Sequence, residues 1–89
     1  MSSPDPEIIR THLFEIINIQ MRSGEPPETK QTYDRLISDG HPQEEVMKML
    51  ACVVMSEIFG ALKNKQPYDH QRYTAALRAL PELPWDDEE

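Results

Sequence analysis

Cysteine is almost absent from this chain, which contains a single one, Cys52. A lone cysteine cannot form a disulfide bond within one molecule, and it rules out metal sites built from Cys-x-x-Cys pairs. The three histidines show no His-x-x-x-His spacing, so we predict neither a metal site nor a cofactor. An unpaired thiol within an apolar segment is typical of a reducing compartment, and we therefore expect a cytoplasmic protein.

Basic side chains are scarce as well, with 9 lysines and arginines against 16 acidic residues and a formal net charge of −7. Nucleic acids and anionic membranes are negatively charged and would be repelled, so we expect neither as a partner. Four of the acids are residues 86–89, and the rest of the chain carries −7 + 4 = −3. The acidity leaves open another interpretation, a nucleic-acid mimic that binds a basic protein groove.

Hydrophobic segments of membrane length are also missing. The longest apolar run is Met49–Met55, whereas crossing a bilayer takes about 20 residues. The first residues lack the basic and apolar regions of a signal peptide, so no membrane partner is expected. A chain of 89 residues has room for one domain, which we place at 1–85, followed by a disordered acidic tail at 86–89.

The run Met49–Met55 is the most informative feature that is present. It lies within a longer segment, 42–64, that otherwise has the pattern of one helix. A helix that is apolar nearly all round cannot lie on a surface, so other helices or a second copy of the chain must cover it. We expect this helix to organise the fold.

Proline and glycine divide the remainder into further helical segments. Gly24 and Gly40 supply stops, and Asp69 has the character of a capping residue. Apolar residues recur at helical spacing and no segment has the pattern of a strand, so the predicted class is all-α, a small four-helix bundle-like domain. The predicted helices are 6–22, 27–38, 42–64 and 70–80.

Within these helices, side chains at helical spacing are expected to form the core. They are Ile9, Leu13, Ile16 and Ile17 in the first helix, Tyr33, Leu36 and Ile37 in the second, Val46, Leu50, Val54, Ile58, Ala61 and Leu62 in the third, and Tyr73, Ala76, Leu77 and Leu80 in the last.

Two ionisable residues, His12 and Glu57, interrupt the apolar faces of the first and third helices. Such a group must find a partner or change its protonation, so we identify them as a candidate buried polar pair. One interpretation is a small-molecule or metal-dependent enzyme that uses both residues. The interpretation we favour is structural, with partners such as Tyr33 or Arg72, and no catalytic residue is predicted.

The flank of helix 42–64 that carries Lys48 and Lys63 is also apolar. Covering only the opposite face would leave this flank in water, which favours a homodimer through this helix. In the alternative, the other helices surround it in a monomer. The candidate interface residues are Met49, Cys52, Val53, Phe59 and Trp85.

Trp85 stands in a segment that also contains Leu83 and the four terminal acids. One interpretation is a docking peptide for a basic partner with a groove, because aromatic side chains anchor interfaces. The other, which we favour, is that Leu83 and Trp85 fold back over the domain's own core.

Several segments of the chain together carry a resemblance to a known family. They are Glu25-Pro26-Pro27-Glu28-Thr29, Tyr33-Asp34-Arg35-Leu36, Asp39-Gly40, Glu44-Glu45, Ala51-Cys52-Val53-Val54, Glu57-Ile58 and residues 73–80. Over about Ile16 to Pro81 the chain resembles one group of small bacterial all-helical proteins, the DUF1841-like group. The resemblance implies an all-α fold but no activity, substrate or cofactor, because the group is catalogued only as a domain of unknown function. Some of its members carry a histidine near the position of Met49, and its absence here weakens a metal or acid–base role.

Taken together, these patterns predict a small cytosolic interaction or accessory protein that self-associates, with a possible further protein partner. Its specific role does not follow from the sequence.

Overall fold

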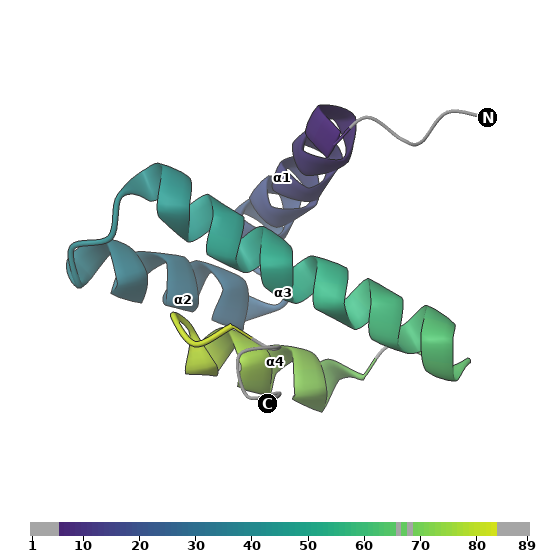
Figure 1. The fold of residues 1–89 in the computed structure, drawn as a ribbon. Coiled ribbons are helices and arrows are strands. Elements are labelled where there is room, and N and C mark those ends of the chain that lie inside the picture. The colour runs from purple at the N-terminus through teal and green to yellow at the C-terminus, as the bar shows by residue number, and fades with distance from the viewer. Residues whose placement is uncertain (1–5, 66, 68, 84–89) are drawn as a thin grey trace.

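The computed structural model describes residues 6–65, 67 and 69–83, and these residues form four helices and no strand (Figure 1). Its elements are α1 (Pro6–Ser23), α2 (Pro27–Ser38), α3 (Gln43–Asn64) and α4 (His70–Ala79). The predicted all-α domain of four helices around a long apolar third helix is therefore confirmed. In the described part of the chain, none of these helices has the length and hydropathy of a membrane span.

The first two helices end close to a glycine whose backbone conformation favours that residue type. Gly24 follows α1 with a φ of 75°, and Gly40 lies beyond α2 with a φ of 101°. Both are left-handed conformations that cost a residue with a Cβ atom more than they cost glycine. The α4 helix begins as predicted, because the Asp69 carboxylate accepts a hydrogen bond from the backbone N–H of Arg72 at 3.1 Å.

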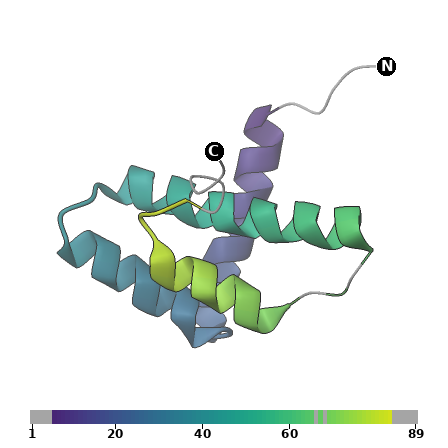
Figure 2. The same ribbon diagram turned by 60° about the horizontal axis from the view of Figure 1, so that its bottom comes forward.

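Helices α2 and α3 form a central pair, and α1 and α4 each pack against both of them. In Figures 1 and 2, α1 crosses behind α3 and α4 lies beside α2. The N-terminal half of α1 and the C-terminal half of α3 both extend beyond the crossing point. Both ends carry exposed apolar side chains, among them Ile8 of α1 and Leu62 of α3.

The core lies where α3 meets the other three helices. The N-terminal part of α3 supplies most of it, because six of its residues between positions 46 and 54 are buried. The seven residues of the Met49–Met55 run are all buried or half-buried, as expected of a segment too apolar for the surface. The other core residues are Leu13, Ile17, Leu36, Tyr73, Leu77 and Leu80.

Several predicted core positions are wrong. Ile16, Ile37, Ile58 and Leu62 are all exposed. The two α3 residues belong to the C-terminal half of the helix, where the structure buries no residue after Val54. This half extends past α1 (Figure 1). The predicted core of α2 was incomplete, because Thr29 and Thr32 are buried and were not included.

A polar cluster that the sequence did not predict joins three helices. The side-chain oxygen of Gln20 on α1 accepts hydrogen bonds from the Thr29 hydroxyl of α2 at 2.7 Å and from the Tyr73 hydroxyl of α4 at 2.9 Å. Because Thr29 is fully buried, this oxygen satisfies a donor that water cannot reach. The cluster fixes the positions of α2 and α4 relative to α1.

Candidate functional site

Glu57 is held by the start of α4. Its two carboxylate oxygens accept hydrogen bonds from Arg72 Nε at 3.1 Å and Arg72 Nη2 at 3.0 Å, and the backbone N–H of Asp69 donates a third at 3.1 Å. The hydrogen bond from Arg72 is the main reason why the pKa of Glu57 lies below its ordinary value, although burial opposes the shift. These three hydrogen bonds hold α3 against the start of α4, and we call them the α3–α4 bracket.

His12 does not meet Glu57. It is an exposed residue of α1, in a shallow hollow lined by Glu7, Ile8 and Thr11 of the same helix. The predicted buried polar pair is therefore wrong, because His12 is exposed to water and the Glu57 carboxylate is bound by Arg72 and the backbone of Asp69. Within the described segments, no three His, Cys, Asp or Glu side chains are grouped as metal ligands would be.

The five predicted interface residues separate into different environments. Val53 is only 1% exposed and belongs to the core, so its assignment to a surface is wrong. Met49 and Cys52 are half-buried, whereas Phe59 is 61% exposed. Trp85 lies outside the described residues, as does the acidic segment 86–89.

A groove separates the N-terminal half of α1 from α3. Its volume is about 390 Å³, and nearly all of its surface is apolar. Among the described residues that line it, the charged ones are Arg10 of α1 and Lys48 of α3, and neither forms an ion pair with a described residue. Burial in its wall raises the pKa of the Cys52 thiol. The full lining of this α1–α3 groove is Ile9, Arg10, Leu13, Phe14, Lys48, Ala51, Cys52 and Met55.

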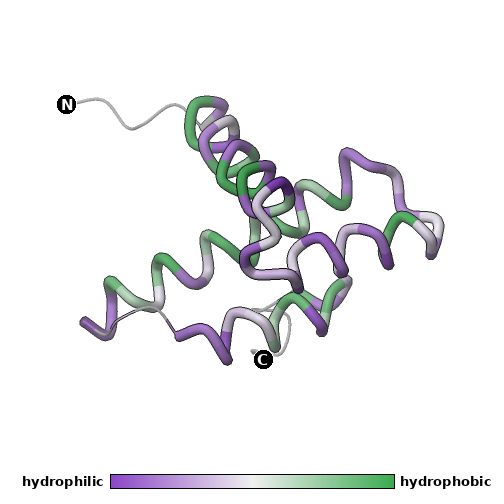
Figure 3. Tube along the Cα trace, turned by 180° about the vertical axis from the view of Figure 1, so that it is seen from behind, coloured by the Kyte–Doolittle hydropathy of each residue, from purple (hydrophilic) through white to green (hydrophobic). Residues whose placement is uncertain are grey.

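An exposed apolar ridge continues the groove along α3. Ile58, Phe59 and Leu62 are 44%, 61% and 70% exposed, and we call these three residues the α3 ridge. Met55, in the groove wall, lies four residues before Phe59 and seven before Leu62, a spacing that places all three on one side of a helix. Figure 3 shows the hydrophobic positions on the C-terminal half of α3. Groove and ridge therefore form one apolar face.

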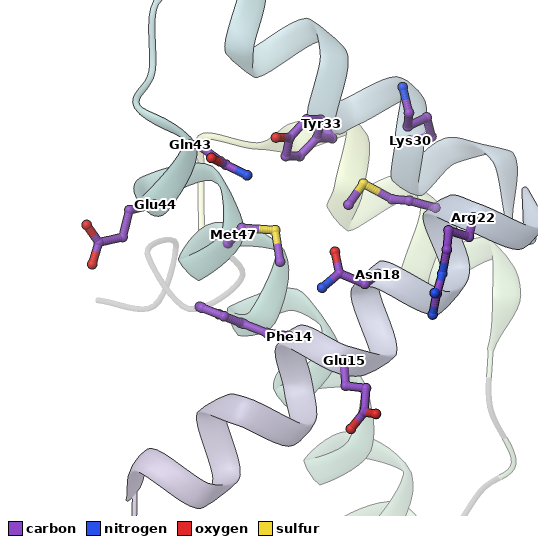
Figure 4. A pocket seen from close by; sticks show the side chains of 10 residues that line it. Phe14, Glu15, Asn18, Arg22, Lys30, Tyr33, Gln43, Glu44 and Met47 are labelled. Atoms are coloured by element: carbon purple, nitrogen blue, oxygen red, sulfur yellow. The ribbon is translucent and has the colours of Figure 1, made fainter.

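A second cleft, larger than the groove, lies where α1, α2 and the first turns of α3 meet, and we call it the three-helix cleft (Figure 4). Its volume is about 720 Å³. Phe14 and Met47 form apolar walls, and the Asn18 amide points between them, while Glu15 and Glu44 point away. The cleft thus combines apolar walls with a polar amide that could form hydrogen bonds to a bound group.

Sequence reasoning missed the basic side chains that edge the groove. In the sequence, Lys48 serves only to identify one flank of its helix, and Arg10 belongs to no predicted site. The signal was present in principle, since Arg10 lies one turn before Leu13 and Phe14 on α1. What the sequence does not contain is the angle at which α1 crosses α3, and that angle brings these two cations to one groove.

No protein-family model matches the sequence, and neither a curated protein nor a solved structure matches it. The resemblance to the small bacterial helical family therefore stays a prediction, and function must be argued from the surfaces described above.

Proposed function

We propose that this protein is a small cytoplasmic interaction protein that self-associates, and that two copies meet through the α3 ridge. The observation that carries the proposal is the exposure of Ile58, Phe59 and Leu62 on consecutive turns of one helix. Large apolar side chains grouped on a surface favour a protein contact, because burying them removes apolar area from water.

The distribution of charge favours a second copy as the partner. A chain with a net charge of −7 repels its own copies, so a contact between two identical patches is favoured where those patches carry little charge. From Ala51 to Leu62 the sequence contains one charged residue, Glu57, and Arg72 holds that carboxylate. The α3 ridge therefore lies on a long part of α3 that carries no unpaired charge. Two acidic chains can approach each other there without bringing one carboxylate against another.

The geometry of the ridge suits a two-fold contact. If two α3 helices cross in opposite directions at Phe59, Lys63 of one copy lies opposite Met55 of the other, because these residues are equally far from Phe59. Such a contact is isologous, so each copy contributes the same patch. It brings no lysine against another lysine.

A rival surface exists on α1, where Ile8 and Ile19 are each at least half exposed. His12 lies between these two isoleucines along α1, and Glu15 lies beside them. Burying this surface would therefore also remove ionisable groups from water. We therefore assign the contact between copies to α3.

A matched pair of variants tests the assignment. Leu62→Glu places a carboxylate on the ridge, and Ile19→Glu makes the same type of change on the rival surface. Light scattering over a range of concentrations should give Leu62→Glu a dissociation constant at least about tenfold higher than that of the unmodified chain, a loss of about 1.4 kcal/mol. Ile19→Glu should leave it unchanged. The reverse order, or a monomer at every concentration, would contradict the proposal.

A further inference from the structure

We infer that the α1–α3 groove binds an acidic peptide segment with an aromatic anchor, and that its occupant is the C-terminal segment Trp85–Glu89 of a second copy. The inference rests on the proposed self-association and deepens it, because it names a second contact between the two copies. It follows from the chemistry of the groove, the chemistry of the segment and the path of the chain.

The groove combines an apolar floor with a basic edge. Leu13, Ala51 and Met55 supply part of the floor, and the charged residues in its lining, Arg10 and Lys48, are both cationic. Acidic residues outnumber basic ones by 16 to 9 in the whole chain, so a groove lined by two cations and no carboxylate is not the average surface of this protein. Its electrostatic complement is an occupant with an apolar group next to negative charge.

The C-terminal segment has this composition. Trp85 is the one tryptophan of the chain, and Asp86, Asp87, Glu88 and Glu89 follow it directly. Tryptophan is among the strongest anchors of protein interfaces, because it buries a large area with little loss of side-chain freedom. The indole would lie on the floor while the carboxylates approach the two cations, which have no ion-pair partner among the described residues.

The path of the chain favours the groove of another copy. Leu83, two residues before Trp85, lies in a hollow between α3 and α4 that is lined by Val53 and Ser56. Ala51 and Met55, which line the groove, lie on the opposite side of α3 from Val53 by helical spacing. Cys52, at the near wall of the groove, lies on the same side of α3 as Ser56. Two residues of extended chain span about 7 Å, whereas a helix with its side chains is about 10 Å across. The main chain of the same copy is therefore too short to pass round α3 to the side of Ala51 before Trp85, which favours the floor of another copy's groove.

A second contact would also bring the area of the dimer interface closer to that of stable interfaces. The exposed parts of the three ridge residues amount to roughly 350 Å², taking about 200 Å² for a fully exposed large side chain. Stable interfaces bury about 800 Å² on each partner. A docked tryptophan and its neighbouring residues would supply much of the difference.

The fluorescence of the single tryptophan tests the inference in the full chain. Trp85 emission should be blue-shifted when the copies are associated and should move to the red on dilution, with the same midpoint as the fall in mass measured by light scattering. Blue-shifted emission that is independent of concentration would place Trp85 on its own copy and overturn the inference. Red emission at every concentration would overturn it as well.

Charge-reversal variants identify the groove as the site. Arg10→Glu and Lys48→Glu should each move the emission to the red at a concentration where the unmodified chain is associated. Arg22→Glu is the matched control, because Arg22 is also exposed on α1 but lines the three-helix cleft. Emission that responds equally to Arg10→Glu and Arg22→Glu would reflect net charge alone and would overturn the assignment to the groove.

Measuring both the mass by light scattering and the fluorescence of Trp85 shows whether this inference or the proposed function fails. If the chain associates through the α3 ridge while Trp85 emission stays red, the inference fails and the proposed self-association stands. If Leu62→Glu leaves the mass of the dimer unchanged while Arg10→Glu lowers it and shifts the emission, the proposed ridge contact fails and the groove contact stands.

Discussion

The Tyr73 hydroxyl donates a hydrogen bond to the side-chain oxygen of Gln20, 2.9 Å away, and so joins α4 to α1, two helices that pack on α2 and α3 rather than on each other. The same oxygen accepts from Thr29, which is fully buried. Gln20 is half-buried, so one amide oxygen links three helices near the core of a small domain.

Replacing Gln20 with leucine should destabilise the fold by about 2 kcal/mol, because the buried Thr29 hydroxyl would lose its acceptor. Adding Thr29→Val removes the unpaired hydroxyl as well. The double variant should therefore recover part of the loss, since replacing both partners of the Thr29–Gln20 hydrogen bond by apolar groups costs little, while the hydrogen bond from Tyr73 to Gln20 remains absent. Urea unfolding of the three proteins measures this, and strictly additive losses would contradict the account.

Glu57→Gln tests the α3–α4 bracket through pH. The folded-state pKa of Glu57 lies below its ordinary value of 4.5, so the carboxylate stabilises the fold above that pH and loses this effect as the pH falls through the folded-state pKa. Because water screens the pair, we expect Glu57→Gln to lower the free energy of unfolding at pH 7 by about 1 kcal/mol or less.

The difference between the unmodified chain and Glu57→Gln should shrink below about pH 4.5 and vanish once the carboxylate is protonated. Thermal unfolding from pH 7 to pH 3 measures it. Glu82→Gln serves as the control, because Glu82 is exposed and forms no ion pair with a described residue. Identical pH profiles for Glu57→Gln and the unmodified chain would show that the bracket contributes nothing.

Gly60→Ala should stabilise the protein. Gly60 lies inside α3, where alanine is favoured over glycine by about 0.5–1 kcal/mol, and an added Cβ would meet Arg72 Nη2 at an ordinary 3.5 Å. Gly40→Ala should have the opposite effect, because Gly40 has a φ of 101°. Chemical denaturation of both variants distinguishes these effects, and a destabilised Gly60→Ala protein would mean that the approach of α4 leaves no room.

Cys52 should react slowly with thiol reagents. Burial raises the pKa of its thiol, so less of the reactive thiolate is present at pH 8 than in the unfolded chain. We expect reaction with a disulfide reagent to be at least about tenfold slower in the folded protein than in guanidinium. A rate equal to that of the unfolded chain would show that the groove wall is open to solvent around Cys52.

Helix ends and central core residues could be predicted from the sequence, whereas the point at which a buried stripe becomes exposed could not. Helix ends follow from local chemistry, so Gly24, Gly40 and Asp69 indicate boundaries without reference to the rest of the fold. Leu50 and Leu77 are buried as expected, because each lies at the centre of an apolar stripe. Ile58 and Leu62 continue such a stripe and are exposed, since the sequence does not state where the covering helix ends.

Partners of polar residues were harder to predict than the core. Arg72 was one of two residues considered for Glu57 and is its partner, whereas His12 meets nothing on α3. The role of Gln20 was not foreseen, because both of its donors come from other helices. Such contacts depend on crossing angles, which hydrophobic periodicity does not specify.

Sedimentation velocity of the unmodified chain over a wide concentration range tests the central claim, that the exposed face of α3 is where two copies meet. One chain has a mass of 10.3 kDa, so the account predicts a reversible change from 10.3 to 2 × 10.3 = 20.6 kDa as the concentration rises, abolished by Phe59→Glu. A mass of 10.3 kDa at every concentration, or a dimer that Phe59→Glu leaves intact, would contradict it.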